Sequence, residues 1–501
     1  MLNEKDFPPL PSQAAKRTRI KQRLPAAVPA RNDGIAASIN DLPDELWLEI
    51  LDYLPALDLE DFQLQTLSNL SRVNRRIHSL VSERLYAGFN SFFCASYPFL
   101  RTIISNQQLA GSVQSMRIAY GHGVHAERSK YKPSVLDKRI VKNGLKGKDI
   151  PGWKSWAVDC NNDEAEQEIL YATILMHTPN ITKLTVDDGE VPYVIPKWLD
   201  LVRRIGSGSR FGHVHKFLHL KSLQIETSSL KIRQLSPIFK LPALKNVTLI
   251  GLIELARTEE EQSGVLQRLL PIRTSAVEEL SLKEALIQDD ILEVLLRSFR
   301  VLRRFELTYS HDRYTDVDSG PFSSPLNSLK IHRLELQVLH LSNNFFGSIS
   351  SISPGMVKCL HQFEELYDLQ VPLDTLVDTG RPHSTISVDS LPPALTSLTI
   401  FVKAGRQLLF LDALKHLASQ SRECIPLLRE LRIELFSVYE NSSKYDWEGF
   451  RQIWAKTGVH LEIRFESDEY DERDGVGILG LRADTDTESE SESDEESLYS
   501  N

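Results

Sequence analysis

A six-residue pattern of the form L-x-x-L-x-L recurs along most of the chain and constrains its fold more than any other feature. With other apolar residues allowed at the leucine positions, the copies are VQSMRI (113–118), ITKLTV (181–186), LKSLQI (220–225), LKNVTL (244–249), VEELSL (277–282), LRRFEL (302–307), IHRLEL (331–336), LYDLQV (366–371), LTSLTI (395–400) and LRELRI (428–433). GVHLEI (458–463) is a degenerate last copy. From residue 184 onward the copies are spaced by 24 to 39 residues, which is the period range of a solenoid.

The segments between the copies carry helix signals. DDILEVLLRSF (289–299) has one apolar helical stripe behind two acidic residues, and EGFRQIWAKTG (448–458) ends in a glycine, a favourable helix C-cap. EAEQEILYATILMHTPN (164–180) ends similarly at a proline. A strand followed by a returning helix buries its apolar face only by stacking on its neighbours, so an α/β repeat over residues 106–465 is predicted. The rival architecture, a doubly wound α/β sheet, would favour continuous apolar strands over this alternation.

These copies resemble leucine-rich repeats, in a loose form that lacks the asparagine of the strict repeat. The resemblance implies an irregular horseshoe whose leucines point inward and whose flanking residues lie on the concave sheet face. That face is polar and of mixed sign, which suits a protein partner better than the negative backbone of a nucleic acid. The candidate substrate face comprises Arg304, Glu306, Arg333, Glu335, Asp368, Glu430 and Arg432.

Residues 41–87 predict three short helices. In the stretch NDLPDELWLEILDYLP (40–55), Pro43 suits the first helical position, and apolar residues follow at helical spacing until the second proline. A second helix is expected after Asp58, and the third is expected to carry one apolar face. That face comprises Leu67, Leu70, Val73, Ile77 and Leu80. Three short helices bury little surface, so the module needs a partner or a neighbouring domain to be stable.

This module resembles an F-box, especially the fungal form with a leucine- and valine-rich third helix. The resemblance rests on LPDELWLEILDYL, LDLEDF and LSNLSRVNRRIHSLVSERLY, which open on the Leu-Pro pair of the family. F-boxes bind the Skp-type adaptor of SCF (Skp–cullin–F-box) ubiquitin ligases, so an adaptor surface is implied within residues 39–105, taken as the F-box and its linker helices. Its residues would be Leu42, Pro43, Leu46, Ile50, Leu54, Leu59, Leu70, Val73 and Ile77.

Formal charge is concentrated at the two ends of the chain. The net charge is −10, to which residues 466–501 contribute −12 and residues 1–38 contribute +4. Neither end has apolar periodicity, so a disordered basic arm and a disordered acidic tail are expected. KRTRIKQR (16–23) is either a nuclear-import signal or a solvated basic cluster. The tail offers Ser489, Ser491 and Ser493 to acidophilic kinases as candidate phosphorylation sites.

A second basic region lies at 121–158, with nine Lys or Arg residues against three acidic ones. Aromatic residues accompany it: Tyr120, Tyr131, Trp153 and Trp156. Basic and aromatic residues together are typical of nucleic-acid surfaces, but a degenerate repeat with a long polar loop is the favoured interpretation. If this region is functional, substrate capture is the role we expect.

No catalytic set is visible, and we expect no enzyme activity, no cofactor and no metal. HVHKFLH (213–219) lacks an adjacent carboxylate or thiolate ligand, and GSGSRFG (206–212) lacks the lysine of a phosphate loop. The four cysteines show no C-x-x-C spacing, which is typical of a reducing compartment. No apolar run approaches the roughly 20 residues of a membrane span, and no secretory signal is visible. A soluble protein of the nucleus or cytoplasm is expected.

The expected function is the substrate-recognition subunit of an SCF-type E3 ubiquitin ligase. The F-box would bind the Skp-type adaptor and, through it, a cullin–RING ligase, while the repeats would bind a protein substrate. The alternative is a leucine-rich-repeat interaction scaffold with no ubiquitin-ligase role. A third and weaker alternative is a nucleic-acid-binding solenoid that uses residues 121–158.

Overall fold

The structure is a computed structural model that describes most of the chain between residues 42 and 466. The described residues are 42–54, 60–120, 131–162, 166–188, 195–206, 211–227, 230–254, 259–309, 323–343, 357–376, 386, 390–403, 407–436 and 447–466. The basic arm at 1–38 lies outside them, and so does the acidic tail beyond residue 466 with its three candidate phosphorylation sites. No helix in these ranges is long and apolar enough to cross a membrane.

The N-terminal module consists of three helices, α1 (Asp44–Asp52), α2 (Glu60–Ser71) and α3 (Arg75–Leu85). The sequence-based division was wrong in one respect, because Leu67 and Leu70 lie in α2 rather than in the third helix. The reason is local: Asn74 caps α3, and its side chain accepts a hydrogen bond of 2.8 Å from the backbone N–H of Ile77. The third helix therefore begins at residue 75.

An α/β region with one parallel sheet follows. Its strands are β1 (Gly88–Asn90), β2 (Ser115–Tyr120), β3 (Lys183–Asp188), β4 (Ser222–Thr227), β5 (Asn246–Ile250), β6 (Ile253–Glu254), β7 (Glu279–Ile287), β8 (Arg304–Tyr309), β9 (Val338–Asn343), β10 (Asp368–Pro372), β11 (Ser397–Lys403), β12 (Glu430–Phe436) and β13 (His460–Glu466). They pair in chain order from β1 to β13, except that β5 pairs directly with β7 and the short β6 also pairs with β7.

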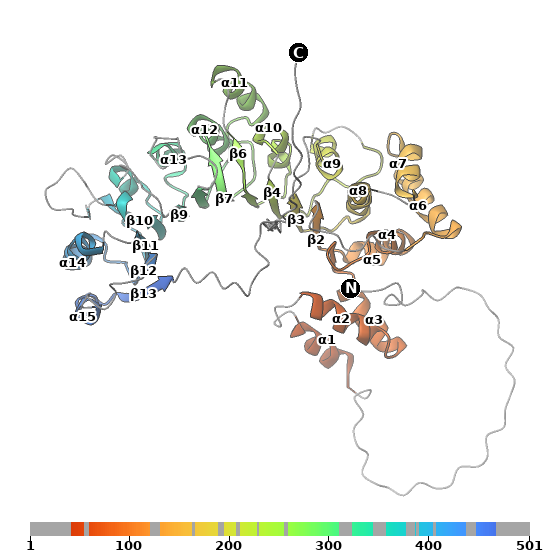
Figure 1. The fold of residues 1–501 in the computed structure, drawn as a ribbon, viewed down its shortest axis with the longest axis horizontal. Coiled ribbons are helices and arrows are strands. Elements are labelled where there is room, and N and C mark those ends of the chain that lie inside the picture. Colours follow the sequence, from red (N-terminus) through yellow and green to blue (C-terminus); the bar gives the residue numbers. More distant parts are fainter. Residues whose placement is uncertain are drawn as a thin grey trace, which may run out of the picture.

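Helices return the chain between strands. They are α4 (Ser96–Ser105), α5 (Gln107–Ser112), α6 (Val135–Lys148), α7 (Trp153–Cys160), α8 (Gln167–His177), α9 (Lys197–Gly206), α10 (Ile232–Leu235), α11 (Glu259–Leu269), α12 (Asp289–Ser298), α13 (Ser323–Leu329), α14 (Gln407–Cys424) and α15 (Trp447–Thr457), with 3₁₀ turns η4 (Ile238–Lys240), η5 (Lys330–His332), η6 (Val357–Gln362) and η7 (Leu373–Thr375). Figure 1 shows an arc whose inner side is formed by the strands and whose outer side is formed by the helices, with α1–α3 beside one end.

The inward-pointing apolar residues form rows that run across the whole sheet. The central position of each copy is in register with those of its neighbours, as in the pairs Leu184↔Leu223 and Leu398↔Leu431. These side chains are fully or almost fully buried between the sheet and the helices. Because side chains alternate along a strand, the residues on either side of each row lie on the opposite, open face.

Ten of the eleven predicted copies coincide with a strand, which begins at the third residue of the copy. The copy at 331–336 is wrong. The strand there is β9, and it begins two residues into the overlapping sequence LQVLHL (336–341). Residues 330–332 instead form the turn η5, and Leu334 is 53% exposed rather than part of the inner row. The correct repeat was shifted by five residues.

The basic region at 121–158 was expected to be a degenerate repeat with a long polar loop, and the loop part was wrong for most of the residues that the structure describes. Residues 135–148 form α6 and residues 153–160 form α7. The helices form because each buries an apolar stripe, with Val141 and Leu145 on α6 and Ala157 and Cys160 on α7. Residues 121–130 lie outside the described ranges.

The hydrophobic core changes identity close to residue 87. Leu85 is the last buried residue in the core of the three-helix module, whereas Phe89 belongs to the core of the α/β region. Strand β1 pairs with β2, and Phe99 on α4 packs against Phe89 with tilted rings whose centroids are 4.9 Å apart. Residues 88–105 therefore pack with the sheet, although the sequence placed them with the helical module.

Candidate functional site

Helix α1 has two apolar faces, one buried and one exposed. Trp47 and Leu51 point into the three-helix core and are 7% and 2% exposed. Leu46 directly precedes Trp47 and Ile50 directly precedes Leu51 in the sequence, and these two residues are 44% and 46% exposed. Successive helical residues are rotated by about 100°, so the second pair faces away from the first. A half-exposed apolar face on a helix that has already filled its own core is typical of a surface that another protein covers.

Two arginines of α3 fix the position of α1. Arg76 donates to Asp44 at 2.6 Å and also to the backbone carbonyl of Leu42 at 2.5 Å. Arg84 binds Asp52 at the other end of α1 at 2.5 Å. Exposed ion pairs of this kind contribute only about 0–1 kcal/mol each, but they connect both ends of α1 to α3. The exposed face of α1 is therefore held in one orientation relative to the rest of the module.

The structure divides the predicted adaptor-binding residues into exposed, partly buried and buried positions. Those exposed are Pro43, Leu46, Ile50 and Val73; those partly buried are Leu42, Leu54 and Leu70. Leu59 lies outside the described residues. Ile77 is the correction, because it is 2% exposed inside the three-helix core and offers no surface to a partner. The predicted set of adaptor-binding residues therefore combined positions that form the core of the module with positions on its surface.

Tyr53 is a surface residue of this module that the sequence analysis did not select. It is 69% exposed and directly follows α1. The signal was present, since residues 46, 50 and 53 follow the i, i+4, i+7 spacing of one helix face. We refer to Leu46, Ile50, Tyr53 and Val73 together as the exposed apolar patch of the module.

The open face of the sheet carries a second candidate site, centred on His340 of β9. Its Nδ1 lies 3.3 Å from Oε1 of Glu306 on β8, and its Nε2 lies 3.2 Å from Oδ2 of Asp368 on β10. Ser281 donates to the other oxygen of Glu306 at 2.9 Å, and Arg304 donates to Oε1 at 3.0 Å. The five side chains come from four neighbouring strands, and we call them the His340 cluster.

The His340 cluster shifts two pKa values in opposite directions. The hydrogen bond with His340, although opposed by burial, lowers the pKa of Glu306 to about 2. Burial alone would lower the pKa of His340, but its contacts with Asp368 and Glu306 raise it overall. Because both ring nitrogens face carboxylates, the doubly protonated imidazolium satisfies both contacts and the neutral ring only one. The cluster therefore favours a positive charge between two negative ones.

The remaining candidate substrate residues divide into two groups. Arg432 on β12 donates to Glu462 on β13 at 2.8 Å, and its second contact is Glu430 at 3.4 Å. Arg333 and Glu335 were predicted on this face but do not belong to it, because the strand at that repeat begins at residue 338. The sequence analysis missed His340 for the same reason, and the overlapping copy LQVLHL is the signal that identifies it.

The histidines at 213–219 do not gather around a common point. His215 places Nε2 2.7 Å from the carbonyl oxygen of Leu175, and its ring meets Phe217 edge-on. Burial lowers the pKa of His215 to about 4, so the neutral ring has a structural role. Within the described ranges there is no group of three or more His, Cys, Asp or Glu side chains that could hold a metal ion.

Comparison with known families assigns only the N-terminal module. Residues 39–89 match the F-box-like family, which covers α1, α2 and α3 and ends within β1. No curated protein matches this chain in sequence. The molecule thus has an N-terminal helical F-box-like region, followed by an α/β region with a parallel sheet.

Proposed function

We propose that this chain is the substrate-recognition subunit of an SCF-type E3 ubiquitin ligase. The observation that carries the proposal is the F-box-like match at residues 39–89, combined with the exposure of Leu46 and Ile50 on α1. F-box domains generally bind Skp-type adaptors. Burying a large aliphatic side chain contributes about 1.5–3 kcal/mol, so a rigid face of several such residues suits a stable subunit contact.

The α/β region, in this proposal, is an irregular leucine-rich-repeat horseshoe of the kind that follows fungal F-boxes, and it binds a protein substrate. Its support is the repeat itself, since the strands pair in chain order and begin at a fixed position of each L-x-x-L-x-L copy. The core change near residue 87 favours an F-box at 39–87 and a repeat region from 88 to 465. The basic arm at 1–38 and the acidic tail at 466–501 flank them.

The chain has no catalytic role in this mechanism and needs no cofactor. Its F-box would connect it to an adaptor and a cullin–RING ligase, while its repeat region holds the substrate. Tethering both on one rigid chain turns ubiquitin transfer into a proximity-driven step, because it raises the effective concentration of substrate lysines near the ubiquitin-charged enzyme. The direct ion pairs between α1 and α3 would keep the adaptor face in a fixed orientation.

The deciding experiment is a binding measurement between the full chain and a purified Skp-type adaptor. The proposal expects a stoichiometric complex on size-exclusion chromatography that withstands moderate salt, because the contact is apolar. A folded chain that does not bind the adaptor would contradict the ubiquitin-ligase role and would leave the scaffold function in its place.

A further inference from the structure

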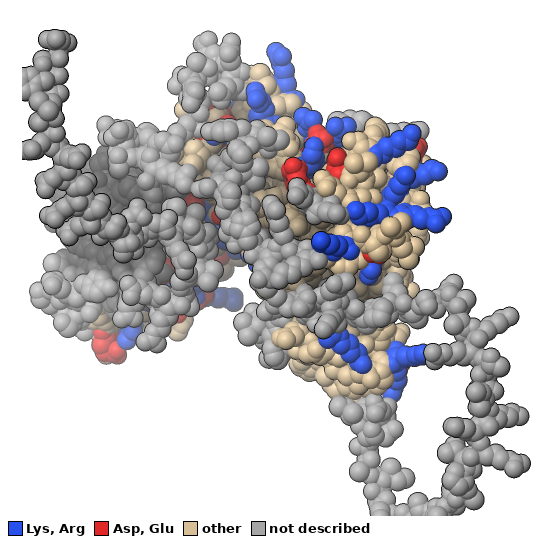
Figure 2. All heavy atoms as spheres, turned by 45° about the vertical axis from the view of Figure 1, so that its right-hand side comes forward, with Lys and Arg blue, Asp and Glu red and all other residues tan. Residues whose placement is uncertain are grey.

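Lys and Arg side chains gather on the part of the α/β region where α6 and α7 lie, and Figure 2 shows this face. Seven of the basic residues of the 121–158 region fall within the described residues, against the acidic Asp137 and Asp149, and α7 adds one further acid, the exposed Asp159. On α6 the spacing of Lys138, Arg139 and Lys142 is i, i+1 and i+4, so Lys138 and Lys142 project along the same side of the helix. The helix pair therefore presents a concentrated positive charge.

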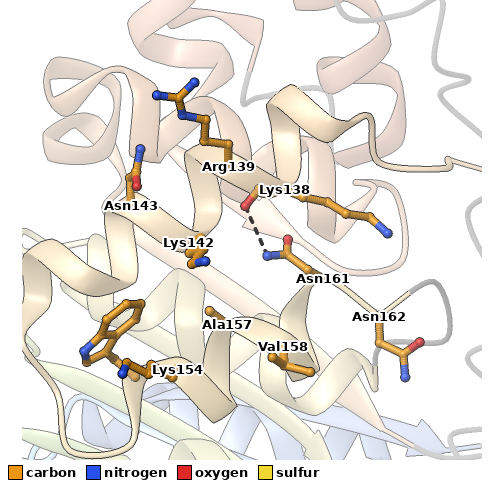
Figure 3. A pocket seen from close by; sticks show the side chains of 10 residues that line it. Lys138, Arg139, Lys142, Asn143, Lys154, Ala157, Val158, Asn161 and Asn162 are labelled. Carbon is orange, nitrogen blue, oxygen red and sulfur yellow. Dashed lines mark hydrogen bonds between the residues drawn. The ribbon is translucent and has the colours of Figure 1, made fainter.

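These cations surround a pocket between α6 and α7 with a volume of about 890 Å³. Figure 3 shows its lining side chains, which come from the two helices and from the residues directly after α7. The lining consists of Lys138, Arg139, Lys142, Asn143, Trp153, Lys154, Ala157, Val158, Asn161 and Asn162. We call this the α6–α7 pocket. Its volume lies within the usual range of pockets that take a ligand.

The positive charge of the pocket is not neutralised by the neighbouring acid on α6. Asp137 is buried and faces away, toward Arg101 at 3.3 Å and the Tyr131 hydroxyl at 2.6 Å. Although burial opposes its ionisation, hydrogen bonds from Tyr131, Ser134 and Arg101 hold the pKa of Asp137 below its ordinary value. Arg139 and Lys142 are exposed and make no ion pair with any described residue. An anionic ligand would thus meet cations that are free to bind it.

The rest of the lining fits a peptide better than a nucleic acid. Val158 is 69% exposed and lies beside Ala157, which gives the pocket an apolar wall among its cations. A nucleic acid would stack its bases on exposed aromatic rings. Here Trp156 is not part of the lining, and its indole N–H donates to Thr173 at 2.7 Å. Trp153 is the one aromatic residue of the lining, partly buried and with the Lys154 ammonium 6.0 Å from its ring centroid, so successive bases have no series of rings to stack on. Carboxylates and small apolar side chains match this surface.

We propose that the α6–α7 pocket captures an acidic segment of the protein substrate, with its carboxylates on Arg139, Lys142 and Lys154 and an apolar side chain against Val158. The proposal rests on the proposed function, whose substrate class it names. A segment that combines acidic with apolar side chains fits better than the acidic run of the chain's own tail, because that run, DTDTESESESDEE (484–496), has no apolar residue to place against Val158. The tail leaves β13, ten strand steps or about 48 Å along the sheet from β2, and its 35 residues are long enough to span that distance, so the test includes its deletion.

A series of packed helices connects the pocket to the F-box-like module. Helix α6 packs on α4, α4 packs on α5, and α5 contacts α3. The approach of α6 to α4 is so close that a Cβ atom at Gly144 would come within 2.6 Å of Ile104. A substrate segment bound at α6–α7 would therefore be held at the end of the arc where the adaptor-binding module lies.

The test measures the binding of a short fluorescent peptide of Glu, Asp and Leu to the full chain by fluorescence anisotropy. The double variant Arg139→Glu/Lys142→Glu should weaken binding by about tenfold to a hundredfold, because it replaces two attractions with two repulsions. The matched control Arg268→Glu/Arg300→Glu reverses two exposed cations outside the pocket and should leave affinity within about twofold. The same peptide with Gln and Asn in place of its acids should not bind.

Four outcomes would overturn the proposal. The acidic peptide does not bind at all, or it binds both double variants equally well. A single-stranded oligonucleotide binds more tightly than the peptide and competes with it, which would assign the pocket to nucleic acid. Deleting residues 467–501 raises peptide affinity by about tenfold or more, which would make the tail the occupant.

Adaptor binding is measured on the same variants and should be unchanged in all of them. A failure of the pocket proposal can therefore be told apart from a failure of the ubiquitin-ligase role.

Discussion

His340 and Glu306 face each other across neighbouring strands, with Nδ1 of His340 3.3 Å from Oε1 of Glu306. Asp368 binds the other ring nitrogen from the opposite side at 3.2 Å. In sequence the three residues are about thirty positions apart, and only the pairing of β8, β9 and β10 brings them together. The open face of the sheet therefore contains a charged network that no single repeat reveals.

This network makes stability depend on pH in two windows. The pKa of His340 is raised above its ordinary 6.5, so its stabilising contribution is complete below that pH and is lost as the pH rises past the raised value. The pKa of Glu306 is lowered from 4.5 to about 2, so its contribution is complete above 4.5 and is lost as the pH falls toward 2. Arg304 and Ser281 also face Glu306, and both favour its charged form.

We expect His340→Gln to lower the melting temperature most at about pH 6 and less at about pH 8 or above. The measurement is the melting temperature of wild type and variant across this range at constant ionic strength. His460→Gln, which replaces a histidine outside the network, is the matched control. An equal loss at both pH values would show that no titration of His340 between them contributes to stability, which would contradict this prediction.

The repeat register is tested by two leucine substitutions. Leu339 is completely buried in the inner row of the sheet, whereas Leu334 is 53% exposed. Leu339→Asp should lower the free energy of unfolding by several kcal/mol, because it buries an unpaired charge, and Leu334→Asp should change it by less than about 0.5 kcal/mol. Urea denaturation of the two variants makes the comparison. If Leu339→Asp were as stable as wild type and Leu334→Asp were strongly destabilised, the repeat at this point would be IHRLEL (331–336) instead of LQVLHL (336–341).

The exposed apolar patch should dominate adaptor binding. Leu46→Ala/Ile50→Ala should weaken the affinity for a purified Skp-type adaptor by about a hundredfold or more, because both side chains would be desolvated at the centre of the contact. The matched control is Leu218→Ala/Leu427→Ala, which truncates two leucines of similar exposure, 57% and 50%, in the α/β region. Isothermal titration calorimetry measures both. Equal affinities in the two variants would place the adaptor on another face of the module.

Ile77 should behave as a core residue and not as a contact. Ile77→Ala should destabilise the module by about 2–5 kcal/mol, as expected for a large-to-small change in a filled core. At a temperature where the variant remains folded, its adaptor affinity should stay within a few-fold of wild type. Thermal unfolding followed by circular dichroism, combined with calorimetry at low temperature, separates the two effects. A loss of affinity without a loss of stability would mean that a partner reaches Ile77 directly.

The sequence by itself determined the α/β character of the region after residue 87 and the F-box-like module at its N-terminus. Alternating apolar positions such as Leu184 and Val186 select strands, and the 3.6-residue spacing in 289–299 selects a helix, because each pattern buries its apolar face in only one backbone conformation. The Leu-Pro opening at residues 42–43 is equally local. These local patterns can be recognised in the sequence without knowing which other parts of the chain the segments pack against.

Only the tertiary structure decided which of two overlapping frames forms β9. IHRLEL and LQVLHL share Leu336, and both fit the pattern once other apolar residues are allowed at the leucine positions, so the pattern names both candidates without choosing between them. The choice is made by the neighbours, because Leu339 is the residue that lies in register with Phe305 on one side and Leu369 on the other. That five-residue shift removes Arg333 from the open face and places His340 there.

Packing also decided which apolar residues remain on the surface. Leu46, Trp47, Ile50 and Leu51 are all apolar members of one short helix, and composition alone does not say which of them α2 and α3 will cover. A helix has several sides, and the positions of its neighbours determine which side is buried; α2 and α3 cover Trp47 and Leu51. The same holds for α6, where burial of its apolar stripe turns the lysines and arginine outward to form a pocket with α7.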